Sequence, residues 1–425
     1  MRQLRVARGL TQEQLAGTRF TKQYMSGIER GTTRPTADTL VWLAERLGVD
    51  AHFLEVGFSS GEWERAHSLI TRAEAAVEGD DYASGLALLG EAATVRDLRS
   101  APELHLRALV TEGWARMSLG ELDHALAVLR GAHELADEPA FADIDRADVL
   151  FRLGCCRYKL SSISTALALF DDALTLADRS GFPCDRLRSQ ILSWRSRCYR
   201  RQRDWEAAHE DVERALELAE SLGDARAVAD AHFQGSIIAE RQGRWVLARS
   251  YAERAKLLYE EIDDGTKVAR LLNNLGGLAF LLGKPEEAVA SLKRAFSLAL
   301  DAGNDADAAQ AVSSLAQVHL RTDRPELAEA QARQALELLA GRVDYLDEIG
   351  NAELVLGRAL AEQDRVEEAE VHFAASEDAF ARASLTSHRA AAWAAQADLA
   401  VRRGDKDSAV ALYRRAVESL QDFHF

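Results

Sequence analysis

The side chains that could do chemistry in this sequence are placed for binding rather than for catalysis. Its eleven histidines are scattered, with no HExxH spacing and no Ser/His/Asp arrangement that the spacing singles out. The run from Gly277 to Pro285 superficially suggests a phosphate-binding loop. However, its glycine spacing is one residue too long, and Pro285 stands where a magnesium-binding Ser or Thr is needed. We therefore expect no enzymatic activity, no catalytic residues and no cofactor.

The four cysteines show no CxxC pairing and no histidine at metal-ligand spacing. We expect them to be reduced, partly buried thiols, with no metal site among them. They are Cys155, Cys156, Cys184 and Cys198.

The charges are distributed unevenly along the 425 residues, which carry a net charge of −16. Residues 1–34 hold seven Lys or Arg against two acidic residues, and residues 1–57 hold eight against six. The rest of the chain is therefore strongly acidic. A basic N-terminal segment on an acidic body is typical of a protein in which only that segment contacts phosphates.

No stretch of about 18 apolar residues is present, so the sequence offers no membrane-spanning helix. The first nine residues, MRQLRVARG, also lack the apolar core of a signal peptide. These features predict a cytoplasmic protein without membrane contact.

Helix signals divide the N-terminal segment into five short helices. Thr11 and Gln14 form a capping box before the second helix, Thr21 can cap the third, and Thr36 and Asp50 precede the fourth and fifth. Glycines end the helices. These short helices are the scaffold that must position any side chain of the basic segment that contacts phosphates.

These residues resemble the lambda-repressor/Cro-type, or XRE-like, helix-turn-helix family. The resemblance rests on Leu10-Thr11-Gln12-x-x-Leu15-Ala16, on Tyr24-Met25-Ser26-x-Ile28-Glu29-Arg30-Gly31 and on Arg34-Pro35-Thr36, followed by Leu40-x-x-Leu43-Ala44-x-x-Leu47-Gly48-Val49. It spans nearly all of residues 2–54. Two departures exist: the first helix is several residues shorter than usual, and the turn after the second helix is one residue shorter.

The resemblance implies which residues contact DNA, because in this family the helix at residues 22–30 lies in the major groove. Lys22, Gln23 and Ser26 are then the base-reading residues, with Gln23 suited to adenine and Lys22 to guanine. Phosphate contacts are expected from Gln12, Thr21 and Arg34. The alternative for each is an ordinary solvated surface residue.

Beyond residue 61 the sequence repeats itself nine times, with a period of 40–42 residues. Each repeat has a small anchor residue, a small residue twelve positions before it and, in most repeats, a large apolar residue four positions after it. Turn residues recur five positions before the anchor. They are Gly120, Gly243, Gly283 and Gly404, with Asp323 and Asp364. Small residues let two helices cross closely, and the large residue fills the gap.

This pattern resembles the tetratricopeptide repeat, in a form longer than its usual period. We therefore predict an all-α protein, with a five-helix helix-turn-helix domain followed by a right-handed superhelical solenoid of about nine helix pairs. The predicted boundaries are a DNA-binding domain at residues 1–57, a linker at 58–61 and a repeat domain at 62–425.

The first helix of each repeat lines the concave groove of such a solenoid. On each of these helices the groove sites are counted from its small residue. They are expected six positions before it, two or three positions before it, and one position after it. In the first three repeats these sites are mostly apolar, and further along they become polar. The candidate peptide-binding residues are Gln190, Arg197, Gln234, Asn273, Asn274, Ser313 and Gln317. Amides and hydroxyls there could hydrogen-bond an extended peptide, and Arg197 could hold a carboxylate. The alternative is a set of solvated groove residues, with the arginine paired to nearby carboxylates.

The two-part architecture resembles the bacterial peptide-pheromone receptors of the Rgg–NprR–PlcR–PrgX group. The resemblance implies a transcriptional regulator of quorum-sensing type, a homodimer on a palindromic operator whose repeat groove binds a short signalling peptide. The alternative is a regulator whose repeats bind a protein partner. A scaffold that no longer binds DNA is disfavoured because Lys22, Gln23 and Arg34 are present.

Overall fold

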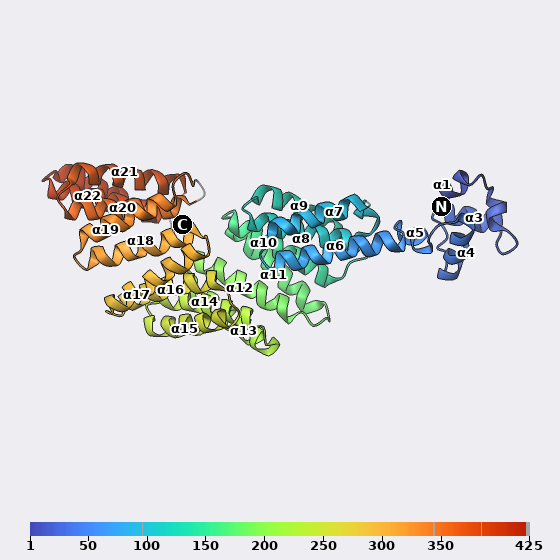
Figure 1. Cartoon of the computed structure of the whole chain (residues 1–425), viewed down its shortest axis with the longest axis horizontal. Helices are drawn as coiled ribbons and strands as arrows, with labels where there is room; N and C mark the ends of the chain where they lie inside the picture. Colours follow the sequence, from blue (N-terminus) through green and yellow to red (C-terminus); the bar gives the residue numbers. More distant parts are fainter. Residues whose placement is uncertain (96, 343–344, 384, 422–425) are drawn as a thin grey trace. The chain divides into compact units, whose positions relative to one another are not determined.

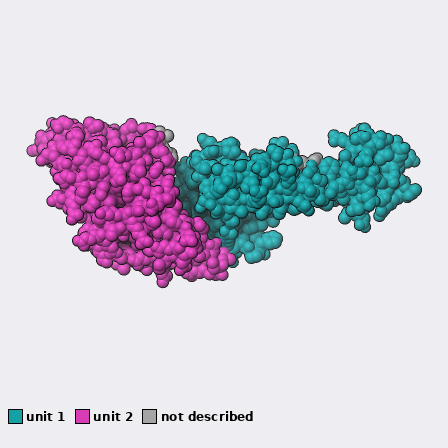
Figure 2. Space-filling view, viewed as in Figure 1, with its two compact units in different colours: residues 1–198 teal, residues 199–425 magenta. Residues whose placement is uncertain are grey.

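The computed structural model describes residues 1–95, 97–342, 345–383 and 385–421, and its helices contain nearly all of them. No strand occurs within these ranges, which confirms the predicted all-α class. The chain divides into two compact units, residues 1–198 and residues 199–425 (Figure 2). No helix in the described ranges is long and apolar enough to cross a membrane.

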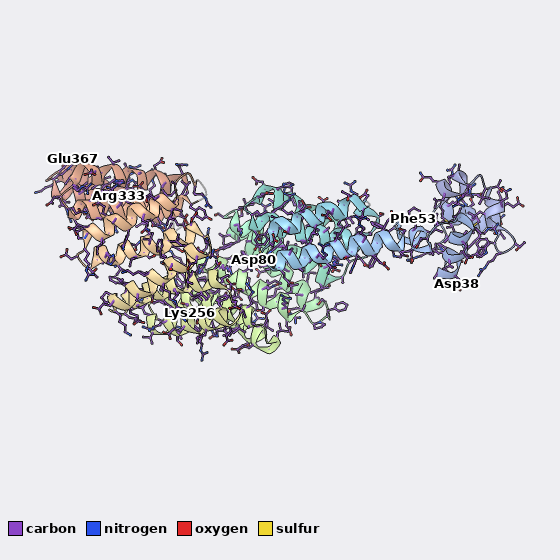
Figure 3. The ribbon with its side chains drawn as sticks, viewed as in Figure 1. Asp38, Phe53, Asp80, Lys256, Arg333 and Glu367 are labelled. Carbon is purple, nitrogen blue, oxygen red and sulfur yellow. The ribbon has the colours of Figure 1, made fainter. Side chains whose placement is uncertain are left out.

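Five helices form the N-terminal domain (Figure 1). They are α1 (Arg2–Ala7), α2 (Gln12–Ala16), α3 (Lys22–Glu29), α4 (Ala37–Leu47) and α5 (Ala51–Val56). Figure 3 labels Asp38 in the first turn of α4 and Phe53 in α5. Leu15, Met25 and Leu43 are fully buried between these helices and form the core. The number and order of the helices agree with the prediction.

The predicted caps are present in this domain. The Thr11 hydroxyl accepts a hydrogen bond from the Gln14 amide, and the Gln14 side chain accepts one from the Thr11 amide, which completes the capping box. Thr21 caps α3 in the same way through the amide of Tyr24. Gly48 ends α4 in a left-handed conformation with φ of 57°, which glycine adopts without a steric cost. Local sequence signals therefore set the boundaries of these helices.

The expected linker at residues 58–61 is shorter in the structure than in the prediction. Helix α6 (Ser60–Glu78) already begins at Ser60, because Ser59 and Glu62 form a second capping box. Phe58 is fully buried in the core of the first repeat, where it belongs to the same cluster as Ile70. The segment expected to be a linker thus contains a helix start, anchored by an aromatic core residue.

Eighteen helices, α6 to α23, follow one another as nine consecutive pairs in the described ranges (Figure 1). In the first unit these are α6, α7 (Tyr82–Val95), α8 (Pro102–Ser118), α9 (Leu122–Ala136), α10 (Asp143–Lys159), α11 (Ile163–Arg179) and α12 (Asp185–Arg201), which ends just beyond the unit boundary. In the second unit they are α13 (Trp205–Leu222), α14 (Ala225–Arg241), α15 (Trp245–Glu261), α16 (Gly265–Leu281), α17 (Pro285–Asp301), α18 (Asp305–Arg321), α19 (Pro325–Leu338), α20 (Leu346–Glu362), α21 (Val366–Arg382), α22 (Thr386–Arg402) and α23 (Lys406–Gln421). A short 3₁₀ turn, Leu98–Ser100, precedes α8.

The small residues of the repeat lie where the paired helices approach each other. A Cβ atom added at Gly276 would lie 2.6 Å from the Leu292 side chain, and one added at Gly357 would lie 2.6 Å from Phe373. The turn residues named from the sequence all have positive φ angles. The prediction that small residues let paired helices approach closely, with a large apolar side chain packed against them, is therefore confirmed.

Candidate DNA-contacting helix and repeat groove

The first turn of α3 presents two polar side chains to solvent. Lys22 and Gln23 are exposed, and neither makes a hydrogen bond or ion pair within the described residues. Ser26 lies one turn further along α3 and is half-buried. Thr21 holds this end of the helix in place through its cap. The three residues predicted to read bases are thus grouped at the N-terminal end of one rigid helix.

A hollow of about 680 Å³ lies beside this end of α3, lined in part by Lys22 and Ser26. Arg2 from α1 and Arg30 at the end of α3 also line it. Both arginines are absent from the predicted set of contacts, although Arg30 follows Ser26 at the spacing of one helical turn. The positive charge around the hollow suits a phosphate backbone.

The three predicted phosphate-contacting residues are placed differently from one another. Arg34 is exposed between α3 and α4. The Thr21 hydroxyl serves as a helix cap, and the Gln12 side-chain amide donates to Glu29 Oε2 over 2.7 Å. Gln12 is the first residue of α2, where the first backbone amides have no intrahelical acceptor and can bind an anion.

In the second unit, Asn273 and Ser313 occupy equivalent positions on neighbouring repeats. They stand 40 residues apart, on α16 and α18, which pack against each other. The Asn273 Oδ1 and Ser313 Oγ atoms are both buried, and neither has a hydrogen-bond partner among the described residues. A buried polar atom without a partner costs about 1–3 kcal/mol. Two such atoms in register are candidates for hydrogen bonds to a ligand.

The neighbouring Asn274 has a different environment. Its Oδ1 accepts a hydrogen bond from Ser236 Oγ over 3.0 Å, and its Nδ2 donates to Glu240 Oε2 over 3.1 Å. These bonds join α16 to α14. Of the two adjacent asparagines, Asn273 is therefore the one whose side-chain oxygen is unengaged within the described residues.

The remaining predicted groove residues of this unit differ in exposure. Gln234 on α14 is buried, with 6% of its surface exposed, and it precedes Asn274 by one repeat. Gln317 is exposed on α18, one turn beyond Ser313.

In the first unit, the Arg197 guanidinium lies over the Trp194 ring at 4.4 Å from its centre. Its Nε atom is buried and has no acceptor within the described residues. Trp194 packs against Trp114 and Tyr158, so the apolar groove positions of the early repeats form an aromatic cluster. Gln190, one helical turn before Trp194, is exposed.

The cysteines belong to the helix packing. All four are buried and unpaired in disulfides, and burial raises the pKa of the Cys155 thiol well above its usual value. In the part of the chain that the structure describes, no cluster of three or more potential metal ligands occurs.

Comparison with protein families agrees with this architecture. Residues 1–54 match the helix-turn-helix family model, and residues 228–301 and 267–340 match the tetratricopeptide repeat model. An HTH-type transcriptional regulator of Sinorhizobium fredii, y4dJ, is 51% identical over 47 residues. The match covers 11% of this chain and 61% of that relative's length.

Three solved structures share the fold at low identity. The Rap protein complexed with Competence and Sporulation Factor has a TM-score of 0.60 and 15% identity, and the match covers 85% of this chain and 98% of that one. Apo RapI has a TM-score of 0.63 and 11% identity, over 84% and 97% of the two chains. The apo quorum sensor NprR from B. thuringiensis has a TM-score of 0.62 and 13% identity, over 84% and 98%. The chain is thus a helix-turn-helix protein with a tetratricopeptide-repeat domain, and its fold is that of these proteins.

Proposed function

We propose that this protein is a sequence-specific transcriptional regulator whose repeat groove binds a short signalling peptide that modulates DNA binding. The peptide part rests on one observation. Asn273 Oδ1 and Ser313 Oγ stand at equivalent positions of successive repeats, and both are buried without a hydrogen-bond partner within the described residues. The Rap and NprR structures support it, since one is described as a complex with Competence and Sporulation Factor and the other as a quorum sensor.

At the DNA end, α3 enters the major groove, and Gln23 and Lys22 contact base edges near Ser26. Arg34, Thr21 and the first turn of α2 at Gln12 contact phosphates. The protein acts as a homodimer on a palindromic operator with half-sites about 10 bp apart, because one such small domain buries little DNA surface.

In the groove of the second unit, the peptide runs extended across α16 and α18. Its backbone amides donate to Asn273 Oδ1 and Ser313 Oγ, and Gln317 adds a contact at the rim. Packed helices lie about 10 Å apart, and an extended chain gains about 3.3 Å per residue, so roughly every third residue meets a new helix. Gln234 and Asn274 border this path, whereas Gln190 and Arg197 are candidates for ligand contacts in the first unit.

The peptide part is tested by capture from a synthetic library of seven-residue peptides on the full-length protein, read by mass spectrometry. Calorimetry of the captured peptides on Asn273→Ala and Ser313→Ala should show losses of roughly fivefold to a hundredfold each. Ser297→Ala, an exposed serine on α17, is the matched control. Binding that is unaffected by both groove variants, or no capture at all, would favour the alternative, a folded protein partner.

The DNA part is tested on an operator selected from random sequence. Gln23→Ala should weaken binding to it by about 1–3 kcal/mol and leave binding to random DNA nearly unchanged. Arg34→Ala should weaken both equally and reduce the salt dependence. Equal losses for Gln23→Ala on both DNAs would remove it from the base-reading residues, and a footprint of a single half-site would contradict the dimer.

A further inference from the structure

A hollow of about 350 Å³ opens between α18, α20 and α22 in the second unit. Its floor is apolar and consists of Phe373, Ala395 and Leu399, all at most 3% exposed. Its walls carry three arginines and three carboxylates. A small apolar floor under a charged rim is typical of a ligand subsite that takes one side chain and one charged group.

Two of the carboxylates and one arginine already have partners. Arg402 donates to the backbone oxygen of Ala361 over 2.9 Å and forms an ion pair with Glu362. Asp398 accepts a hydrogen bond from the hydroxyl of Tyr413. These groups are therefore part of the wall rather than free to meet a ligand.

The other two arginines, Arg321 and Arg358, have neither an ion pair nor a hydrogen bond within the described residues. The contact that the structure gives Arg321 is a distant one, 5.9 Å from its guanidinium to the centre of the Phe280 ring. The Arg358 side chain reaches solvent, yet both line the same hollow. Burial lowers the pKa of Arg358, the charge of Asp398 raises it, and the charge of Arg321 lowers it. Neither guanidinium forms an ion pair within the described residues, so both keep N–H donors that an anion lying between them can accept.

We propose that this hollow, the Arg321–Arg358 pocket, binds the free C-terminal carboxylate of a peptide, with the last side chain on the apolar floor. A guanidinium offers paired donors that match a carboxylate, and here two such groups are available. Asp323, Glu362 and Asp398 line the same hollow. Their charge favours a singly charged carboxylate over a doubly charged phosphate.

The peptide part of this inference rests on the function proposed above. Helix α16 packs on α18, and α18 packs on α20, so the pocket continues the row of groove helices that carries Asn273 and Ser313. Two helix spacings of about 10 Å correspond to about six extended residues. The C-terminus of a peptide bound at Asn273 therefore reaches Arg358 after about six or seven residues.

The pocket is tested without a known peptide, using N-acetyl-leucine and its amide as probes on the full-length protein. Ligand-observed NMR titration should show at least tenfold weaker binding of the amide. Arg358→Gln and Arg321→Gln should each abolish this preference, while Arg294→Gln, an exposed arginine on α17, should keep it. Thermal unfolding of each variant checks that the fold is intact. Equal binding of acid and amide, or displacement of the acid by an equal concentration of inorganic phosphate, would overturn the inference.

A second comparison separates this inference from the proposed function. The seven-residue library is offered as free acids and as C-terminal amides. Capture of acids alone supports both proposals. Equal capture of the two forms overturns the pocket assignment and leaves peptide binding standing. Binding of N-acetyl-leucine through Arg358 with no captured peptide supports a carboxylate pocket and overturns the peptide groove.

Discussion

The guanidinium of Arg5 in α1 holds the carboxylate of Glu29 at the end of α3. Arg5 Nε donates to Glu29 Oε1 over 2.6 Å, and Nη2 donates to Oε2 over 3.2 Å. Gln12, at the start of α2, donates to the same Oε2. The Glu29 side chain is only 3% exposed, so three helices meet at one shielded carboxylate. This junction ties the short α1 to α3, the helix that carries Lys22 and Gln23.

Glu29→Gln should therefore destabilise the N-terminal domain by roughly 1–3 kcal/mol. The hydrogen bond from Arg5 lowers the pKa of Glu29. The ionised form thus adds stability above the usual pKa of a glutamate, and this stability is lost as the pH falls through the lowered value. Hydrogen exchange of α1–α3 at pH 7 measures the effect. Glu45→Gln, at an exposed position of α4, is the control and should leave the exchange unchanged.

Adjacent glycines in α16 should respond in opposite ways to the same substitution. A Cβ at Gly276 would meet Leu292 at 2.6 Å, so Gly276→Ala should cost about 1–3 kcal/mol of stability through overpacking. A Cβ at Gly277 meets nothing within 4 Å. Gly277→Ala should therefore add about 0.5–1 kcal/mol, because alanine favours the helix. Urea unfolding of both variants checks this, and equal effects would contradict the predicted packing role of Gly276.

The sequence predicted those features that depend on short-range patterns. Helix caps such as Thr11 and the closely packed Gly276 follow from neighbouring residues or from the repeat period. The environment of Asn274 could not be predicted, because its partners Ser236 and Glu240 lie 38 and 34 residues earlier. The position of a residue within the repeat predicts which face of the helix it lies on. It does not predict whether its side chain is already hydrogen-bonded to another repeat.

The same limit applies to Arg358 in the Arg321–Arg358 pocket, where the sequence could not predict the absence of an ion pair. Arg358 follows Gly357 directly, at a position of the repeat that the sequence assigns to the groove. That register was a signal that could have found it. Its lack of an ion pair, however, depends on how the side chains around the hollow are oriented, which sequence spacing does not reveal.

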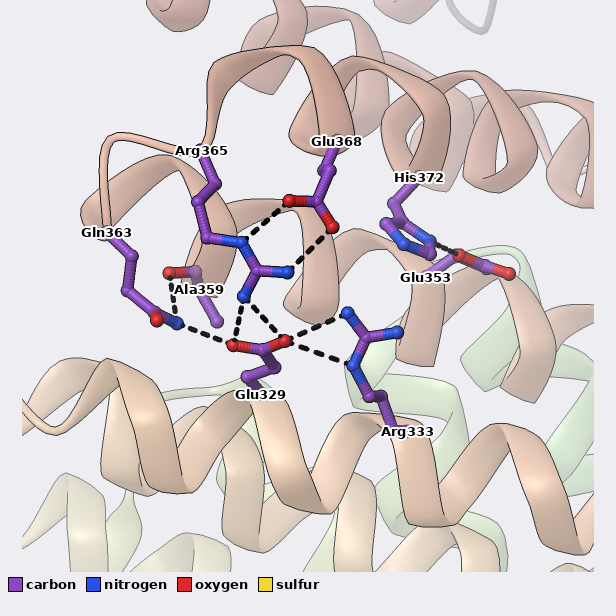
Figure 4. A network of polar contacts seen from close by, with 8 residues as sticks. All are labelled: Glu329, Arg333, Glu353, Ala359, Gln363, Arg365, Glu368 and His372. Atoms are coloured by element: carbon purple, nitrogen blue, oxygen red, sulfur yellow. Dashed lines mark hydrogen bonds and ion pairs between the residues drawn. The ribbon is translucent and has the colours of Figure 1, made fainter.

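The Glu329 carboxylate joins two repeats through a shielded network (Figure 4). It accepts hydrogen bonds from Arg333 and Arg365, both at 2.8 Å, and from Gln363 at 2.9 Å. Glu329→Gln should lower the stability of the second unit by about 1–3 kcal/mol at pH 7. The control is Glu367→Gln, whose side chain is 88% exposed and should contribute less than about 1 kcal/mol.

The effect of Glu329→Gln should also depend on pH. Burial raises the pKa of Glu329, but the hydrogen bonds from Gln363, Arg333 and Arg365 outweigh it and bring the pKa to about 2. Because the folded value is the lower one, the stabilisation is complete above about pH 4.5 and is lost as the pH falls towards 2. Urea unfolding at pH 7 and pH 3 should show a smaller difference between variant and wild type at pH 3. A difference that stays constant would show that the charge of Glu329 is not what the network requires.

Glu348 in α20 should show the opposite pH dependence. Burial, the adjacent Asp347 and the charge of Asp307 raise the pKa of Glu348, and its Oε2 has no partner within the described residues. The folded protein therefore keeps this carboxyl protonated at a pH where the unfolded chain has released the proton. Stability is full below about pH 4.5 and falls as the pH rises through the raised value. Glu348→Gln, which resembles the protonated form, should therefore raise stability at pH 8 by at least about 1 kcal/mol and have little effect at pH 5. Thermal unfolding at the two pH values measures this, with Glu337→Gln on the exposed face of α19 as control. If Glu348→Gln behaves like that control at both pH values, the Glu348 carboxyl is ionised in the folded protein and the inferred pKa direction is wrong.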